Sequence, residues 1–382
     1  MNILRGSRVL WSLKLTRAAP AAATAGVQVQ GPPCHRAFAA MPENVRAAFG
    51  YCVQQVRQYD YPNYVWVAQM PKDLRASLFA LRAFNIETAL VGGQIRSREA
   101  VVGQIRFQWW RDAVRAAFEG APPNHPVVLA LAHTLHQAPP PPTAAPAPAP
   151  AAASGSDSAC ESSCSSSGYG GGSSGLSPGG GAASRYSRYS FKRIIDCREA
   201  DFLDTQPPLE LAALEQYAEG TAAQLMYLQL SAAGVKDKDA DHAASHLGRA
   251  VGITTLLRGT AAHAAARRCY LPMDLCAEAR VSQEDVYGGV VSDGLRDVVH
   301  KVASLAKGHL DEARRLAPRL PPAAASVLLP GVAAGRYLAA LEAANFDPFH
   351  PSLLRGEHSG AEGQAPLAYV LALKWHQLRG TY

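Results

Sequence analysis

The sequence predicts an all-α protein. Apolar residues recur at spacings of three and four through most of the chain outside two biased segments, as on one face of a helix. No run of alternating Val, Ile and Thr competes as a strand. Hydrophobic residues make up 48% of the 382 residues, which suffices for an extensive core.

The first expected helices follow from this spacing. In 44–56 the apolar positions are Val45, Phe49, Cys52, Val53 and Val56. The same period continues through 74–91 and 101–118, and 209–233 and 240–258 are rich in Ala and Leu. Together with later segments, these stretches predict a bundle of roughly ten helices.

Polar residues and glycine predict where several helices begin and end. Gly234 is expected to end the helix that precedes it. Ser282 with Asp285 fits a capping box that opens a further helix. Asp293 is expected to be the N-cap of a helix over 295–316, and Asp237 with Asp241 to begin another helix at its positive end.

Residues 1–38 are typical of a mitochondrial transit peptide rather than a plain disordered tail. The first carboxylate of the chain is Glu43, and five of its six net positive charges lie before it. Lys14 and Arg17 interrupt the apolar run that a secretory signal would need. Without the leader the chain is almost neutral, which argues against nucleic-acid binding, and no apolar window is long enough to span a membrane.

Residues 138–184 form a low-complexity insert, in which 40 of 47 residues are Pro, Gly, Ser or Ala. Such a segment buries too little apolar surface to fold, so we expect it to be disordered and to interrupt one domain that spans 39–382. Cys160 and Cys164 in the insert lack further ligands for a metal site. The odd total of seven cysteines favours a reducing compartment.

Four motifs stand in order along the chain: 78–85 (LFALRAFN), 107–113 (FQWWRDA), 217–222 (YAEGTA), and 252–259 (GITTLLRG) followed by 267–274 (RRCYLPMD). Together they resemble the squalene/phytoene synthase family, and the resemblance covers nearly all of the chain outside the leader and the insert. The resemblance implies an isoprenoid-synthase-like helical bundle. Active members join two prenyl diphosphates with Mg²⁺, a hard cation held by carboxylates on two facing helices.

The aspartates of both family motifs are replaced in this sequence. In the second motif Gly259 and His263 stand at the aspartate positions and Thr255 at the asparagine position. In the first motif the aspartate positions fall near Ala89 and Gly93. Because none of these four side chains is a hard oxygen ligand, the Mg²⁺–diphosphate chemistry is expected to be lost. What remains is a vestigial pocket with candidate residues Asn85, Glu87, Tyr217, Arg258, Arg268 and Tyr270.

With its leader and without these aspartates, the sequence resembles one non-enzymatic branch of the family. Members of that branch assist the assembly of mitochondrial respiratory complex I. This resemblance implies complex I subunits or assembly intermediates as partners, no cofactor, and a peripheral place at the matrix side of the inner membrane. Two alternatives stay open: an active prenyl-diphosphate transferase with a divergent site, and a module that binds a lipid or isoprenoid without chemistry.

Several other residues have both a functional and a structural interpretation. His242 and His246 share a helix face at a spacing that suits zinc, but they lack a third ligand and are expected to be surface or interhelical residues. Trp109 and Trp110 are expected to place one ring in the core and one at its edge. Arg258, Arg267 and Arg268 fit either an anion pocket or interhelical ion pairs. The acids Glu199, Asp201 and Asp204 do not form a metal clamp unaided.

Overall fold

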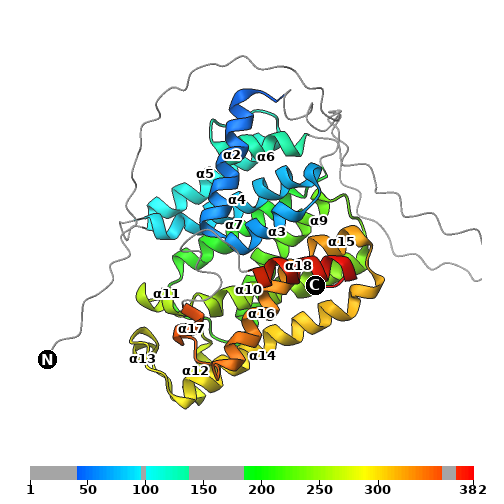
Figure 1. Ribbon diagram of the computed structural model, residues 1–382. Coiled ribbons are helices and arrows are strands. Elements are labelled where there is room, and N and C mark those ends of the chain that lie inside the picture. The colour runs from blue at the N-terminus through cyan, green and yellow to red at the C-terminus, as the bar shows by residue number, and fades with distance from the viewer. Residues whose placement is uncertain (1–40, 96–99, 137–184, 355–366) are drawn as a thin grey trace, which may run out of the picture. The chain divides into compact units, whose positions relative to one another are not determined.

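The computed structural model describes residues 41–95, 100–136, 185–354 and 367–382 (Figure 1). The predicted leader and the predicted insert lie outside these described residues. Helix is the only regular structure within them, which confirms the all-α prediction. In the same residues no helix is both long enough and apolar enough to cross a bilayer.

The N-terminal helices pack around α4. Its inner face carries Leu78, Leu81 and Phe84, all fully buried, and it contacts α2, α6 and α9. Trp110 of α5 is buried and Trp109 is 40% exposed, so the predicted division of the two rings is confirmed. These helices are α2 (Glu43–Tyr59), α3 (Tyr61–Gln69), α4 (Lys72–Gln94), α5 (Ala100–Phe118) and α6 (Pro126–Leu135).

The middle of the chain departs from one prediction. A single helix was expected over 209–233, but a π-helical turn, η1, divides it because its carbonyls accept from residues five positions on. Such turns often lie at functional sites, and this one coincides with the third family motif. The elements are α7 (Arg188–Leu203), α8 (Leu211–Ala218), η1 (Glu219–Ala223), α9 (Gln224–Ala232) and α10 (Lys238–Arg258).

Helix α10 lies against η1 on one side and the long helix α14 on another. The approach to η1 is close because Gly248 has no side chain: a Cβ there would lie 2.3 Å from Cα of Ala223. The C-terminal elements are α11 (Thr260–Ala265), α12 (Met273–Glu278), α13 (Gln283–Tyr287), α14 (Asp293–Leu316), η2 (Ala317–Arg319), α15 (Pro322–Val327), α16 (Pro330–Ala343), α17 (Pro351–Leu354) and α18 (Leu367–Arg379).

Most predicted helix ends are confirmed and one is wrong by a residue. Gly234 has a φ of +72° after α9, and Ser282 forms the reciprocal capping box with Asp285. Asp237 caps α10 by accepting from the backbone N–H of Ala240 at 2.7 Å. Asp293 is not the N-cap of α14. The Ser292 hydroxyl takes that position by accepting from Leu295 at 3.1 Å, a role that Ser fills as well as Asp.

Candidate functional site

The segment after α11 meets α7 at a carboxylate shared by two donors. Arg268 Nη2 donates to Asp201 Oδ1 at 2.8 Å, and the Tyr270 hydroxyl donates to Asp201 Oδ2 at 2.9 Å. Arg268 Nη2 also lies 3.1 Å from the Tyr270 hydroxyl. Two of the predicted pocket residues are therefore brought together, with an acid from another helix as their common partner.

Burial dominates the electrostatics of this cluster. It raises the pKa of Asp201, while the adjacent Arg268 guanidinium acts in the opposite direction. Burial also raises the pKa of Tyr217 to about 12 and raises that of Tyr270, with the Asp201 charge adding to both shifts. Both phenols are therefore neutral hydrogen-bond donors at physiological pH, and neither is poised as a base.

A second cluster joins α7 to α4 through Arg198. This guanidinium is fully buried and donates to the side-chain oxygen of Asn85 at 2.6 Å. It also donates to the Asn85 carbonyl and to the Thr88 hydroxyl. Burial lowers its pKa, and nearby Tyr217 and Asp201 oppose that shift. Among the described residues no carboxylate forms an ion pair with it, and its Nε has no hydrogen-bond partner.

At the two expected aspartate positions of the second motif, the His263 ring packs against Gly259. Gly259 ends α10 and His263 lies in α11, and a Cβ on Gly259 would stand 2.4 Å from Cε1 of the imidazole. The same ring contacts Tyr270 edge to face, with 4.7 Å between ring centroids. Burial, aided by the Arg268 charge, lowers the pKa of His263 to about 4, so the imidazole is neutral at neutral pH.

The first motif is arranged differently. Ala89 and Gly93 are both exposed on α4, and a Cβ on Gly93 would meet no described atom within 4 Å. Glu87, the nearest acid, turns away towards α2 and accepts from the Tyr51 hydroxyl at 2.6 Å. At Gly93 there is therefore room for a longer side chain among the described atoms, whereas the His263 ring fills the space beside Gly259.

The three arginines that could have formed an anion pocket do not converge. Arg268 is paired with Asp201, and Arg267 is exposed and paired with Glu284. Arg258 is exposed and forms no hydrogen bond or ion pair within the described part of the chain. The interhelical ion-pair prediction is thus confirmed for Arg268, and Arg258 does not join the other pocket candidates.

A small cavity lies beside the second motif. It has a volume of about 10 Å³ and touches Tyr270, Thr260 and six apolar side chains of α8, α10, α14 and the segment after α11. This volume holds about one water molecule, whereas small-molecule pockets have volumes of about 300–1,000 Å³. Lining it are Leu214, Ile253, Leu256, Leu257, Thr260, Tyr270, Leu271 and Val302.

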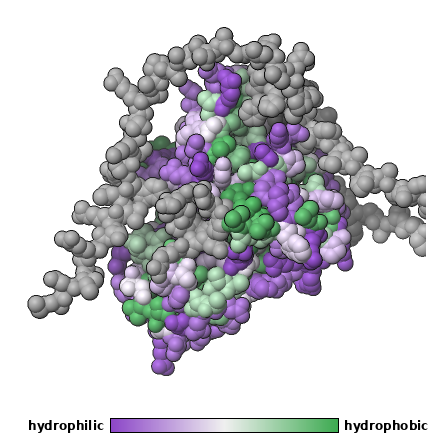
Figure 2. All heavy atoms as spheres, in the orientation of Figure 1, coloured by the Kyte–Doolittle hydropathy of each residue, from purple (hydrophilic) through white to green (hydrophobic). Residues whose placement is uncertain are grey.

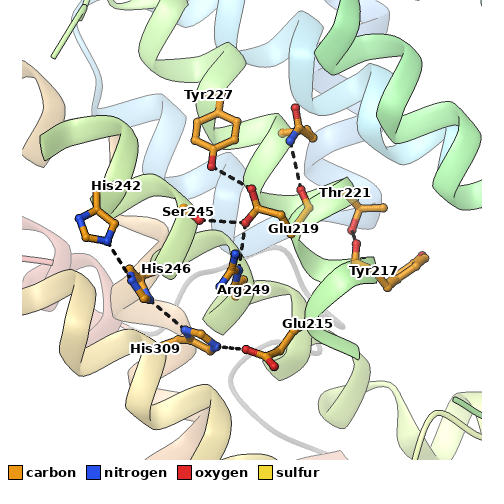
Figure 3. A network of polar contacts seen from close by, with 11 residues as sticks. Glu215, Tyr217, Glu219, Thr221, Tyr227, His242, Ser245, His246, Arg249 and His309 are labelled. Carbon is orange, nitrogen blue, oxygen red and sulfur yellow. Dashed lines mark hydrogen bonds and ion pairs between the residues drawn. The ribbon is translucent and has the colours of Figure 1, made fainter. Parts of the chain in front are cut away.

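A third polar network surrounds the π-helical turn (Figure 3). Glu219 accepts from Tyr227 at 2.9 Å, from Ser245 at 2.9 Å and from Arg249 Nε at 3.1 Å. The carboxylate thus ties η1 to α9 and α10. Sequence reasoning did not single out Glu219 as a site residue, although it stands inside the third motif.

Three histidines form a separate chain of hydrogen bonds beside this network (Figure 3). His309 of α14 lies 2.7 Å from Glu215, His246 lies 3.0 Å from His309, and His242 lies 3.2 Å from His246. The Glu215 carboxylate accepts from His309, and with neutral rings His246 donates to His309 and accepts from His242. The interhelical prediction for His246 is confirmed. Within the described residues no group of three or more metal-ligating side chains is placed to hold a metal ion.

The acids near the end of α7 all have structural partners. Glu199 pairs with Arg111, Asp201 with Arg268, and Asp204 accepts from the backbone of Gln206 at 3.0 Å. Arg198 was missed from the sequence. The one feature of the sequence that could have indicated its role is its position between two acids of the same helix, Asp196 and Asp201. Taken together, the site can position neutral donors and fixed ion pairs, and its described residues assemble no carboxylate clamp.

Comparison with known proteins gives one family. The family model described as squalene/phytoene synthase matches residues 56–146 and 182–359. The chain is 34% identical over 305 residues to a protein of Bos taurus named NADH dehydrogenase (ubiquinone) complex I, assembly factor 6, covering 80% of this chain and 77% of that protein. The protein of the same name from Rattus norvegicus is 35% identical over 303 residues, covering 79% and 76% respectively.

A solved structure has the same fold. The squalene synthase of Alicyclobacillus acidocaldarius aligns with a TM-score of 0.60 at 18% identity, covering 82% of this chain and all of that one. The predicted isoprenoid-synthase-like bundle is therefore confirmed. At this identity the likeness concerns the fold alone.

Proposed function

The chain belongs to the squalene/phytoene synthase family, and we propose that it acts within this family as an assembly factor of mitochondrial respiratory complex I. The observation that carries the proposal is the similarity to relatives named for that role, which extends over 80% of the chain. Complex I subunits or assembly intermediates are the partners, and no cofactor is required.

The geometry of the second motif supports a role without prenyl-transfer chemistry. Ionising an allylic diphosphate needs Mg²⁺ held by carboxylates on two helices. At Gly259 the backbone approaches the His263 ring so closely that a carboxylate would have to displace it.

The proposal includes a subcellular location. Residues 1–38 act as a mitochondrial transit peptide, and the single domain over 39–382 works at the matrix side of the inner membrane without spanning it. The relatives named for complex I support a mitochondrial location. The acid-free composition of the leader supports import.

Deletion of the gene tests the role. Blue-native gels of mitochondria from the organism that encodes the chain should show selective loss of complex I, and the wild-type gene should restore it. A gene without codons 2–38 should not restore it, and the same truncated gene fused to an unrelated mitochondrial presequence should. Normal complex I in the deletion strain would overturn the proposal.

Two further functions are separated by the purified protein. An active transferase would form product from farnesyl or geranylgeranyl diphosphate with Mg²⁺, and any such product would remove the non-enzymatic proposal. A lipid- or isoprenoid-binding module would retain a ligand in native mass spectra of protein purified from mitochondria. We expect neither turnover nor diphosphate binding that depends on Mg²⁺.

A further inference from the structure

The C-terminal helix α18 exposes a continuous apolar stripe. Leu367, Leu371, Trp375 and Leu378 are 77%, 62%, 55% and 84% exposed. At about 100° per residue these four positions fall within an arc of about 80° on the helix. Figure 2 shows hydrophobic side chains on the face of the molecule where Figure 1 places α18.

The opposite side of α18 is fixed to the bundle. Tyr369 and Leu373 are buried, and the Tyr369 hydroxyl donates to the Pro62 carbonyl at 3.3 Å. Beyond the helix, Tyr382 is buried and its hydroxyl donates to the Ala313 carbonyl at 2.6 Å. The outward stripe is therefore a second face on a helix whose inner face already has its partners.

The charges next to the stripe have one sign. Lys374 and Arg379 are exposed, and residues 367–382 contain no Asp or Glu. The Arg379 guanidinium lies 4.1 Å from the centroid of the Trp375 ring. Leucines, a tryptophan and flanking basic residues on one helix face are typical of helices that lie in the plane of a bilayer surface. The basic residues complement anionic lipid headgroups.

Helix α5 carries a comparable stripe that lacks this charge pattern. Val101, Ile105 and Trp109 are exposed at four-residue spacing. The next turn of the same face places Asp112, which Gln108 contacts at 3.1 Å and which forms an ion pair with Arg115 at 3.1 Å. The basic charge beside the α5 stripe is thus partly neutralised by a carboxylate, whereas α18 carries no carboxylate, so charge complementarity favours α18.

We propose that α18 docks the protein onto an anionic lipid bilayer, with Leu367, Leu371, Trp375 and Leu378 entering the interface and Lys374 and Arg379 contacting lipid phosphates. At 13 residues the helix offers a contact about 20 Å long. The inference rests on the proposed function for its biological setting, since it assigns the peripheral membrane contact to one helix.

Vesicle flotation tests the inference. Protein purified from mitochondria should float with phosphatidylcholine vesicles that contain about one-fifth cardiolipin, and at least tenfold less with phosphatidylcholine alone. The double variant Leu371→Gln/Leu378→Gln should lose roughly tenfold in binding to the anionic vesicles, and Lys374→Gln/Arg379→Gln a similar factor. The matched control Val101→Gln/Ile105→Gln on α5 should bind within twofold of wild type. Equal flotation of the wild type and the α18 variants would overturn the inference.

Photo-crosslinking identifies the occupant at single positions. With p-benzoylphenylalanine in place of Leu378, irradiation in mitochondria should yield lipid adducts, and the same probe in place of Ile105 should not. Adducts from position 378 to a protein subunit, to a second copy, or to residues 1–40 or 355–366 of the chain itself would overturn the bilayer assignment.

The gene deletion separates this failure from failure of the proposed function. If deletion removes complex I but the α18 variants float normally, only the proposal that α18 binds the bilayer is refuted. Normal complex I on deletion refutes the assembly role whatever the vesicles show.

Discussion

The two places where the sequence resemblance puts the family's metal-binding aspartates differ in structure. On α4, Ala89 and Gly93 are exposed and a side chain could be added at Gly93 without meeting a described atom. At the end of α10, the His263 ring occupies the space beside Gly259 and packs on Tyr270. The first place is an exposed helix surface, whereas the second is a partly buried contact between side chains.

This difference shows that two positions that look alike in the sequence can have different surroundings. An acid at Gly93 would meet no described atom within 4 Å of its Cβ, but one at Gly259 requires the half-buried His263 ring to shift. The Asp201–Arg268–Tyr270 cluster lies beside the second place, and Arg198 joins α7 to α4, which carries the first. The predictions below test the contrast, beginning with the anchor of α4.

Replacing the buried guanidinium should have the largest effect. Arg198→Met leaves the Asn85 and Thr88 oxygens without their donor, and each buried oxygen left unsatisfied costs about 1–3 kcal/mol. Urea unfolding followed by circular dichroism measures this loss. Arg193→Met, exposed on the same helix, is the matched control and should change stability by less than about 0.5 kcal/mol. A loss below about 1 kcal/mol would show that α4 is not held through Arg198.

The contact between His263 and Gly259 should make the stability of the protein depend on pH. Because the pKa of His263 falls from 6.5 unfolded to about 4 folded, the unfolded chain binds a proton there between these pH values and the folded chain does not. Stability therefore falls as the pH is lowered through that window, by about 2–3 kcal/mol. His263→Asn should remove this part of the pH dependence, and the exposed His300→Asn should leave it intact. Parallel curves for wild type and His263→Asn would contradict the packed neutral ring.

The fold was predictable from the sequence, and so was the lack of acidic side chains at Gly259 and His263. The 3.6-residue period located α2, α4, α5 and α10, and the absence of carboxylates at Gly259 and His263 could be read directly. The contact between these two positions could not be predicted, because only the three-dimensional structure shows the His263 ring beside Gly259. Similarly, period analysis does not detect the π-turn at Glu219, which arises from one extra residue in a continuous helical pattern.

Site residues were harder to predict than helices for a physical reason. Tyr270 and Arg268 stood in a motif, but their partner Asp201 lies 67 positions from Arg268 in the chain, so only the packing of α7 brings them together. Arg198 gave no periodic signal, since a buried arginine takes a position where the helix pattern predicts an apolar residue. Arg258 looked equivalent to Arg268 in the sequence, yet it points into solvent.

The same substitution should have opposite signs at the two places. Gly259→Ala places a Cβ 2.4 Å from the His263 ring, so the ring must shift against Tyr270, at a cost of about 1–2 kcal/mol. In a His263→Ala background the clash is gone, and Gly259→Ala should become stabilising by about 0.5 kcal/mol through helix propensity. Thermal unfolding of the four proteins in this double-mutant cycle measures the coupling. Additive effects would show that the two positions are independent.

On α4 the smallest change is expected. Gly93→Ala meets no described atom within 4 Å in the last turn of a helix, so it should stabilise by about 0.5 kcal/mol, because alanine loses less backbone entropy than glycine on folding. Gly93→Asp gains similar entropy but places a negative charge at the negative end of the helix dipole, so the net change should stay within about 0.5 kcal/mol of zero. Thermal unfolding in low salt, with Gly259→Asp measured alongside, compares the two places. Destabilisation of Gly93→Asp as large as that of Gly259→Asp would mean that the first place is as closed as the second.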